Sequence, residues 1–430
     1  MTTLRRLAPR SFATVCEELD RRSRVALRFE RIWALLEKLE NSHEELKTVQ
    51  VVGTNGKGTT AVALAGVLEA AGVRSGVYLS PHLLSYTERI VLGGNRVSEQ
   101  DFAAVMGGVM TFADRHEVPA TQFELLTAGA LKLFRDRGAE WVCLEAGLGA
   151  RLGAPHDATS VTRSELVALT KLGLDHTEHP GSSVEEIARE KLASLRPGTR
   201  LILGTEDPKV VEVALQACEE VGAELVEVVE RSGYLATVAE DLAPYLAHNV
   251  RVGIRAAETL LGRSLDEAES RGALATRLPG RFAVRHTGDV PVIVDGGHNA
   301  AGVEAAVEAA RNAYGERPLG VVFGALRDKD IGSMLAVLQK DADMLVLTKP
   351  KGERAADPAW VDEVIRPVDG GGSRARVRAD VYDAVEDAVA EMAGRGGAVL
   401  VTGSLQTAAG YLGARSCESE SKSGARARLS

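Results

Sequence analysis

The chain has 430 residues, of which 45% are hydrophobic and 26% charged; this is a globular composition and a length greater than one small core requires. Its 51 basic and 60 acidic side chains give a net charge of -9, which argues against nucleic acid as the main partner. The 4 cysteines lie far apart with no C-x-x-C pair, which argues against a zinc site and a disulfide framework. We expect a cytoplasmic protein with no membrane partner, because we find neither a signal peptide nor a run of about 18 apolar residues.

Residues 51 to 60 read VVGTNGKGTT, which is close to a known phosphate-binding loop but differs in spacing. A β-branched run before the loop predicts a strand, and the run TTAVALAGVLEAA after it predicts a helix over 59–71. The motif G-x-x-x-x-G-K-[ST] requires a hydroxyl residue directly after the lysine, whereas here Gly58 follows Lys57 and Thr59 comes one place later. A search with that pattern would therefore miss this loop.

The loop nevertheless has the chemistry of a phosphate site. Gly53, Gly56 and Gly58 allow backbone N–H groups to turn inward at a helix N-terminus, where the helix dipole favours an anion. Lys57 can reach the outer phosphates, and the hydroxyl of Thr59 can bind Mg²⁺. The alternative interpretation is a glycine-rich strand-to-helix turn that binds nothing.

Apolar, strand-like runs alternate with helical stretches up to about residue 275, which predicts an α/β fold with a doubly wound parallel sheet. The runs are LKTVQVV, SGVYLS, EWVCLEA, ELVALTKL, TRLILG and AELVEVV. A proline-glycine break in ATRLPGRF precedes a second series of runs, DVPVIVDGG, PLGVVFGA, ADMLVLTKP and GGAVLVTGS. We therefore predict one domain over 1–278, a smaller one over 279–414 and a disordered tail over 415–430.

Polar residues follow several of these strands at their carboxyl ends, where ligands bind in open α/β sheets. Glu145 closes WVCLE, Asp175 and His176 follow ELVALTKLGL, and Asp295 closes PVIVD. Together they form an oxygen-and-nitrogen ligand set suited to a divalent cation. Taken singly, Glu145 could cap a helix near LEAGLG, and His176 could be a hydrogen-bonded loop histidine.

Lys191 falls on the apolar stripe of a predicted helix in SSVEEIAREKLASLRPG. The apolar members of this stripe are Val184, Ile187, Ala188 and Leu195. A lysine held in a low-dielectric site tends to have a lowered pKa, which makes it nucleophilic toward CO₂ or available as a catalytic group. The alternative is a lysine that snorkels to solvent.

Ten ordered motifs carry a family resemblance that covers the chain from residue 28 to about residue 412. They are GTNGKGT at 53–59, SPHLLSYTERI at 80–90, QFELLTAGAL at 122–131, LEAGLGARL at 144–152, GLDHTE at 173–178, IAREK at 187–191, PGRF at 279–282, DGGHN at 295–299, RDKD at 327–330 and VTGS at 401–404. The chain resembles the folylpolyglutamate synthase and dihydrofolate synthase family of the Mur ligase superfamily. The resemblance implies a P-loop domain followed by a smaller Rossmann-like α/β domain.

The resemblance also implies an ATP-dependent amide ligase that uses Mg²⁺ and acts as a monomer. In the family, ATP phosphorylates a substrate carboxylate to an acyl phosphate, and the amino group of L-glutamate then displaces phosphate. The carboxylate belongs to a folate or to dihydropteroate. A backbone cradle, a lysine and a metal ion suit this chemistry, because charge spreads over the transferring phosphoryl group.

Carried over position by position, the resemblance assigns roles to residues of this chain. The implied nucleotide contacts are Thr54, Asn55, Gly56, Lys57, Gly58, Thr59, Asn249, Arg281, Asp295 and His298. The implied metal ligands are Thr59, Glu145, His176 and a carbamylated Lys191. Lys57, Lys191 and His176 are the implied catalytic residues. The implied folate contacts are Ser80, His82, Arg89, Phe123 and Asp157.

One segment departs from the family pattern. Family members with both activities read G-G-R-L-D-A-T-N after the metal-binding glutamate, whereas residues 149–160 here read GARLGAPHDATS. Gly153 occupies the position of the pterin-binding aspartate, and Asp157 begins a second Asp-Ala-Thr as though GAPH had been inserted. Either Asp157 is re-aimed by a longer loop or the dihydropteroate site is altered.

Three functions follow from these observations. The first is a folate-glutamate ligase, with or without dihydrofolate synthase activity. The second is a Mur-type ligase that adds an amino acid to a different carboxylate. The third is a catalytically silent nucleotide-binding protein, against which the retained lysines and metal-ligand candidates argue.

Overall fold

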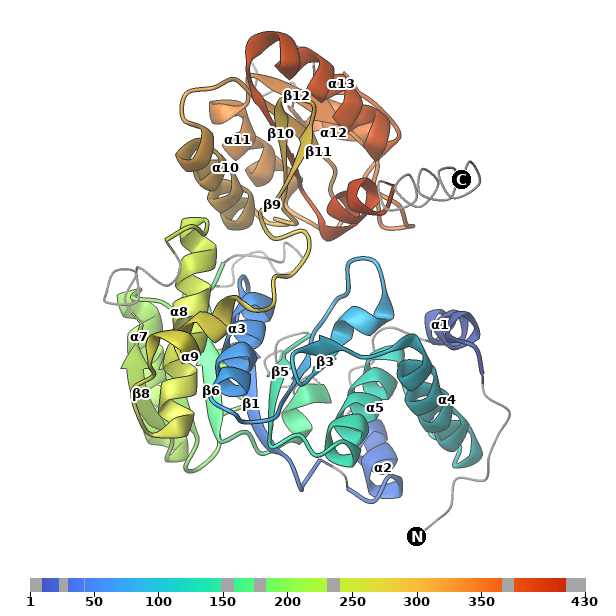
Figure 1. Cartoon of the computed structure of the whole chain (residues 1–430), viewed down its shortest axis with the longest axis vertical. Helices are drawn as coiled ribbons and strands as arrows, with labels where there is room; N and C mark the ends of the chain where they lie inside the picture. Colours follow the sequence, from blue (N-terminus) through green and yellow to red (C-terminus); the bar gives the residue numbers. More distant parts are fainter. Residues whose placement is uncertain are drawn as a thin grey trace, which may run out of the picture. The chain divides into compact units, whose positions relative to one another are not determined.

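The computed structural model describes residues 10–22, 30–41, 43–147, 158–173, 183–229, 240–365 and 375–414. The chain divides into two compact units, each built on its own β-sheet (Figure 1). Among the described residues, the first unit contains those up to residue 172, those from 183 to 240 and those from 246 to 277, and the second contains residues 173, 241–245, 278–365 and 375–414.

The sheet of the first unit has eight strands in the order β4-β3-β2-β5-β1-β6-β7-β8. The strands are β1 (Lys47–Val52), β2 (Ser75–Tyr78), β3 (Ile90–Leu92), β4 (Asn95–Arg96), β5 (Trp141–Glu145), β6 (Leu166–Leu169), β7 (Arg200–Leu203) and β8 (Glu224–Val228). All six strands predicted for this part of the chain are present, and they run parallel. β3 and β4 were not predicted; they form an antiparallel extension beside β2.

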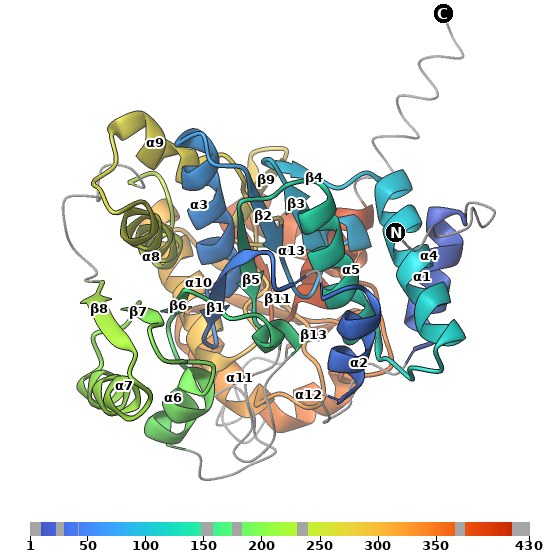
Figure 2. The same ribbon diagram turned by 90° about the horizontal axis from the view of Figure 1, so that it is seen from below.

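The helical segments of this part of the chain are α1 (Phe12–Asp20), α2 (Glu30–Lys38), α3 (Lys57–Ala70), η1 (Tyr86–Arg89), α4 (Glu99–Arg115), α5 (Gln122–Asp136), η2 (Ala158–Val161), α6 (Val184–Leu192), α7 (Pro208–Val221), α8 (Pro244–Leu261), α9 (Glu267–Arg271) and η4 (Gly272–Leu274). Helices α1, α2, α4 and α5 share one hydrophobic core with β2 and β5. Helices α6 and α7 share another core with β6 and β7. Figure 2 shows these two groups of helices at separate parts of the sheet, α6 and α7 beside β7 and β8, and α2 and α4 beside α5.

Helix α3 follows the phosphate loop and is buried along almost its whole length. It packs on β1, β2, β5, α9 and η4. Two glycines make its packing against η4 possible, since a Cβ atom on Gly66 would lie 2.2 Å from the carbonyl oxygen of Gly272. On another side, a Cβ atom on Gly253 of α8 would lie 2.8 Å from the carbonyl oxygen of Thr60. The backbones of three elements therefore meet with no side chain between them.

The predicted start of this helix was wrong by two residues. The helix begins at Lys57 rather than at Thr59, because Gly56 adopts a left-handed conformation with φ +93° and serves as the N-cap. Lys57 is therefore the first helical residue. The predicted end at residue 71 was one residue late, since the helix ends at Ala70, but it does stop before Gly72, which has φ +79°.

The second unit has six strands in the order β13-β12-β11-β14-β10-β9. Its elements are β9 (Ala283–Thr287), β10 (Val290–Val294), α10 (Ala300–Tyr314), β11 (Leu319–Phe323), α11 (Ile331–Asp341), β12 (Met344–Leu347), α12 (Pro358–Ile365), β13 (Arg376–Val377), α13 (Val381–Arg395) and β14 (Ala398–Thr402). The four predicted strands are β10, β11, β12 and β14, all parallel to their neighbours among these four. The additional strand β9 forms an antiparallel hairpin with β10. Both sheets with their covering helices confirm the predicted α/β class.

Candidate active site

The phosphate loop leaves β1 after Val52 and is held by the chain that follows β6. The backbone N–H groups of Thr54 and Asn55 both donate to the carbonyl oxygen of Lys171, at 3.2 Å each. At Gly53 the backbone has φ +135°, and a Cβ atom there would lie 2.1 Å from Oγ1 of Thr170. The loop conformation therefore depends on a glycine at this position and on the end of the neighbouring parallel strand.

Asn249, which the family resemblance assigned to the nucleotide, lies directly against this loop. It belongs to α8, and its side chain is buried. A Cβ atom on Gly56 would lie 2.3 Å from Oδ1 of Asn249. The hydroxyl of Thr60 donates to the backbone carbonyl of Asn249 at 3.1 Å. The structure thus brings together two residues that lie almost two hundred positions apart in the sequence.

Lys57 folds back over the loop from the first turn of α3. Its Nζ donates to the carbonyl oxygens of Gly53 at 3.1 Å and Thr54 at 3.0 Å. The side chain of Thr59 lies in the same first turn and is half-buried. A helix N-terminus, an ammonium group and a hydroxyl in one place form a site that favours a polyanion.

Glu145 lies at the same end of the sheet as the phosphate loop. It is the last residue of β5 and pairs with Val51 of β1, two positions before the loop begins. Its carboxylate is buried, and Oε2 accepts the backbone N–H of Ser80 at 2.9 Å. The parallel register therefore positions a carboxylate beside the loop, as the strand-end argument predicted.

Two of the candidate folate residues in the segment 80–89, His82 and Arg89, contact each other. Nε of Arg89 donates to Nδ1 of His82 at 2.8 Å. The carboxylate of Glu88 accepts the backbone N–H groups of residues 83, 84 and 85, which closes the intervening turn. Arg89 is buried, and His82 is half-buried. The structure therefore holds these side chains in defined positions.

Phe123 lies close to the end of β5 as well. Its ring centroid is 6.0 Å from that of Tyr78 in β2. A Cβ atom on Gly147, two residues beyond Glu145, would lie 2.5 Å from Cζ of Phe123. The chain that follows Glu145 therefore passes this aromatic ring at Gly147. Asp157, which was also implied in folate binding, lies outside the described residues.

Lys191 belongs to α6, and its side chain is 15% exposed. Its Nζ lies 3.6 Å from Oε1 of Glu190. The neighbouring Ala188 and Leu192 are fully packed in the core formed with α7. The lysine therefore lies on the packed side of its helix rather than in bulk solvent.

A complete metal site is not present within the described ranges. No group of three or more histidine, cysteine, aspartate or glutamate side chains is placed there to hold a metal ion. His176, one of the implied ligands, lies outside the described residues. The described oxygen donors are Glu145 and Thr59, and oxygen donors are what Mg²⁺ prefers.

Asp295 organises a polar cluster in the second unit, at the carboxyl end of β10. Its Oδ2 accepts the hydroxyl of Tyr245 and, at 2.9 Å, the backbone N–H of Phe282. Its Oδ1 accepts the backbone N–H of Gly297 at 2.9 Å. Burial and the Asp295 carboxylate raise the pKa of Tyr245 well above its ordinary value, so this hydroxyl remains a donor.

The other two residues implied at this cluster are its sequence neighbours. Arg281 directly precedes Phe282, which has the unusual backbone angle φ +46°, and His298 follows Gly297 and is half-buried. Sequence reasoning missed Tyr245, since no local pattern connects it with a carboxylate fifty residues away.

Among the helices in the described parts of the chain, none is long and apolar enough to cross a membrane.

The chain is similar to known proteins in both sequence and fold. Residues 280–405 match the family described as "Mur ligase, glutamate ligase domain". The chain is 32% identical to the dihydrofolate synthase/folylpolyglutamate synthase of Escherichia coli, over 84% of each chain.

Two solved structures are similar over nearly the whole chain. One is a bifunctional folylpolyglutamate synthase/dihydrofolate synthase with Mn, AMPPNP and L-glutamate bound, with a TM-score of 0.79 and 30% identity over 95% of this chain and 99% of that one. The other is E. coli FolC in complex with DHPP and ADP, with a TM-score of 0.81 and 28% identity over 96% of this chain and 99% of that one.

Proposed function

The chain belongs to the dihydrofolate synthase/folylpolyglutamate synthase family, and we propose that it is the ATP-dependent ligase that joins L-glutamate to a folate. The observation that carries the proposal is the phosphate loop at the start of α3, with Lys57 above it, Asn249 against it and the buried Glu145 beside it. The bound nucleotides and L-glutamate of the similar structures support the same reaction.

In the first step, a carboxylate oxygen of the folate attacks the γ-phosphorus of ATP, and the bond to the β,γ-bridging oxygen breaks. ADP and an acyl phosphate result. The N–H groups at the start of α3 and the ammonium group of Lys57 stabilise the charge on the transferring phosphoryl oxygens. Two loop carbonyls accept hydrogen bonds from that ammonium, which holds it over the loop.

In the second step, the amino nitrogen of L-glutamate attacks the acyl carbon. A tetrahedral intermediate forms and collapses to an amide with the release of inorganic phosphate, while the amino group loses a proton. Holding the two reactants in place accounts for much of the acceleration expected of such an enzyme. We propose that Ser80, His82, Arg89, Phe123 and Asp157 bind the folate.

A divalent cation fits the oxygen donors of this site, and Thr59 and Glu145 would hold it. When bound, Mg²⁺ would neutralise phosphate charge during phosphoryl transfer. Its pairing with Glu145 also gives a role to a carboxylate that is otherwise buried at a strand end.

We propose that Lys191 is carbamylated and that His176 contributes to the same cation site. The unprotonated amine of Lys191 would attack CO₂, forming an N–C bond and releasing one proton, and the product is an anionic carbamate. This anion would lie near the carboxylate of Glu190, so a cation is needed to compensate the two like charges. The limited exposure of Lys191 suits such a protected group.

We also propose that Arg281, Asp295 and His298 contact the nucleotide.

Free Cys16, Cys143 and Cys218 fit a reducing cytoplasm, which is where we propose that the enzyme acts.

Incubation with ATP, L-glutamate and either a reduced folate or dihydropteroate tests the function, with products identified by mass. We expect the folate to gain one glutamyl residue and ATP turnover to require both the carboxylate and the amine. Turnover that requires a different carboxylate would indicate the Mur-type alternative. The absence of coupled turnover with any acceptor would indicate a silent nucleotide-binding protein.

A further inference from the structure

The hydroxyl of Tyr86 is held by hydrogen bonds to residues of two helices, α1 and α5. It donates to Oδ1 of Asp20, the last residue of α1, at 2.6 Å. It also accepts Nε2 of Gln122, the first residue of α5, at 2.6 Å. Burial and the hydrogen bond to Asp20 raise the pKa of Tyr86, so the phenol stays protonated and remains a donor.

The ring of Tyr86 lies against the two basic candidates for folate binding. Its centroid is 4.3 Å from that of the His82 ring and 5.6 Å from the guanidinium carbon of Arg89. Arg89 in turn donates from Nε to Nδ1 of His82 at 2.8 Å. Because an arginine can only donate, Nδ1 is the acceptor, and the ring proton of neutral His82 is on Nε2. The three side chains therefore form one unit whose geometry and tautomer are coupled.

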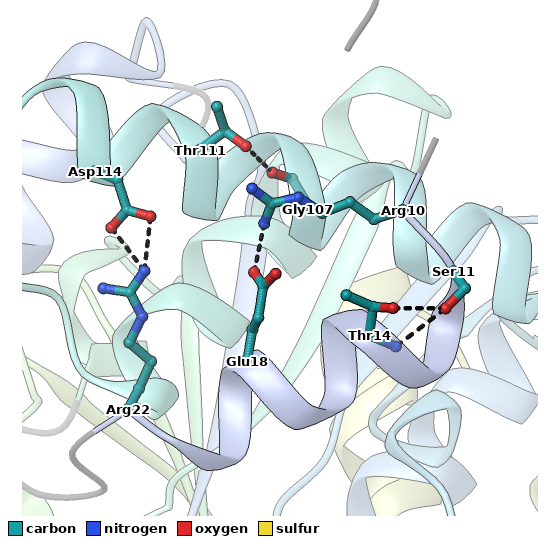
Figure 3. A network of polar contacts seen from close by, with 8 residues as sticks. All are labelled: Arg10, Ser11, Thr14, Glu18, Arg22, Gly107, Thr111 and Asp114. Carbon is teal, nitrogen blue, oxygen red and sulfur yellow. Dashed lines mark hydrogen bonds and ion pairs between the residues drawn. The ribbon is translucent and has the colours of Figure 1, made fainter. Parts of the chain in front are cut away.

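Helix α1 is attached to its neighbour independently of Tyr86. Arg22, two residues after Asp20, forms hydrogen bonds of 2.6 and 2.8 Å with the two carboxylate oxygens of Asp114 in α4 (Figure 3). Val15 and Leu19 bury the apolar side of α1 in the core shared with α4 and α5. Loss of the bond between Asp20 and Tyr86 should therefore leave α1 in place.

We propose that Asp20 and Tyr86 are positioning residues that orient His82 and Arg89 toward the carboxylate-bearing folate. Arg89 presents a delocalised cation and His82 an N–H donor, and this pair suits an anionic acceptor group. The hydroxyl of Tyr86 fixes the ring on which both side chains rest, and Asp20 fixes the hydroxyl. The inference rests on the proposed function, since it concerns the same substrate.

Steady-state kinetics of four single variants and one double variant test this inference. Tyr86→Phe removes only the hydroxyl, and Asp20→Ala removes only its acceptor. Each should raise the KM for the folate about tenfold, as expected for the loss of one charge-assisted hydrogen bond. The KM for ATP and kcat should stay close to wild type. The double variant should be no worse than Tyr86→Phe, because that variant already removes the bond to Asp20 together with the bond from Gln122.

Asp20→Asn serves as the conservative variant, since its amide oxygen can still accept the hydroxyl, and it should restore a KM for the folate close to wild type. Arg22→Ala is the matched control, because it removes a tether of α1 without touching Tyr86. A similar rise in the folate KM for Arg22→Ala would show that α1 acts only as a structural support.

An unchanged folate KM in Tyr86→Phe, or an equal rise in the KM values for folate and ATP, would also overturn the inference. Thermal unfolding identifies any variant that fails to fold. If Tyr86→Phe or Asp20→Ala does not fold, the equilibrium affinity of Asp20→Asn for the folate is measured instead, and an affinity far below wild type would count against the inference. If the wild type adds no glutamate to a folate, the proposed function fails first, and the two failures are thereby distinguished.

Discussion

The backbone N–H of Ser80 donates a 2.9 Å hydrogen bond to Oε2 of Glu145, so one residue implied in folate binding is fastened to one implied in metal binding. Glu145→Gln keeps an oxygen that can accept this N–H but loses the charge. We expect thermal stability close to wild type and a Mg²⁺ requirement shifted upward at least about tenfold, measured by titrating the rate with Mg²⁺.

Glu145→Ala is the informative contrast, because it also leaves a peptide N–H without its acceptor, at a cost of about 1–3 kcal/mol. Normal Mg²⁺ dependence in Glu145→Gln would show that the carboxylate serves the fold alone.

Gly56→Ala should destabilise the protein and weaken nucleotide binding. The new methyl group would collide with Oδ1 of Asn249 at 2.3 Å, and the backbone has φ +93°. Gly72→Ala is a matched control, because Gly72 has φ +79° with nothing within 4 Å of the added atom. The control should lose only about 1 kcal/mol from backbone strain, so urea unfolding of the two variants isolates the cost of the collision. Equal losses would mean that Asn249 moves aside freely.

Lys57→Ala should abolish ligation while leaving the fold intact. Its Nζ donates to the carbonyl oxygens of Gly53 and Thr54, which belong to the loop rather than to a strand or a helix. We expect the free energy of unfolding without ATP to change by less than about 1 kcal/mol. Stabilisation by added ATP, measured by thermal unfolding, should shrink or disappear. Near-normal turnover in the variant would refute the assignment of the phosphate loop.

Lys191 should carry a carbamate at neutral pH. Bicarbonate labelled with ¹³C should give a carbamate signal in the wild type and none in Lys191→Ala. Short carboxylates added to the variant should restore part of the activity, since they can supply the missing anionic ligand. A wild-type spectrum without the signal would favour the simple ion pair with Glu190.

Asp157→Ala should separate the two activities of the family. A pterin edge of fixed donors and acceptors is poorly paired in a site that lacks a carboxylate, so binding of dihydropteroate should suffer most. We expect glutamate addition to a reduced folate to survive and addition to dihydropteroate to be lost or weakened. The measurement is the ratio of the two rates by product mass. If the wild type uses dihydropteroate efficiently and the variant keeps that rate, the pterin is held by other residues, such as Phe123 or those near Arg89.

Central strands and the phosphate loop were predictable, because the physics that forms them is local. Buried parallel strands read as continuous apolar runs, and all ten predicted runs are strands. Strands β3, β4, β9 and β13 were missed, although Gly93-Gly94 and Gly288-Asp289 mark two hairpin turns that could have revealed β4 and β9. Two-residue strands such as β13 carry too few side chains for a periodic signal.

The contacts that shape the candidate site were not predictable in the same way. Tyr86 meets Asp20 across 66 residues of sequence, and Asn249 lies against Gly56 across almost two hundred. Neither pair follows from spacing along a helix or a strand. The family resemblance implied a role for Asn249 but gave no reason for a glycine at position 56. The structure gives one, because a Cβ atom at position 56 would collide with the side chain of Asn249.

The close backbone packing of α3 against η4 and α8 has a thermodynamic consequence for the nucleotide. A helix locked by such contacts cannot rearrange without opening the unit, so its amides should exchange with solvent only through global unfolding. The conformational entropy of ordering the anion-binding N–H groups is then lost during folding rather than during binding. Nucleotide affinity should therefore carry little ordering cost at this end of the site, and ATP should slow deuterium uptake of α3 only by as much as it stabilises the whole unit against unfolding.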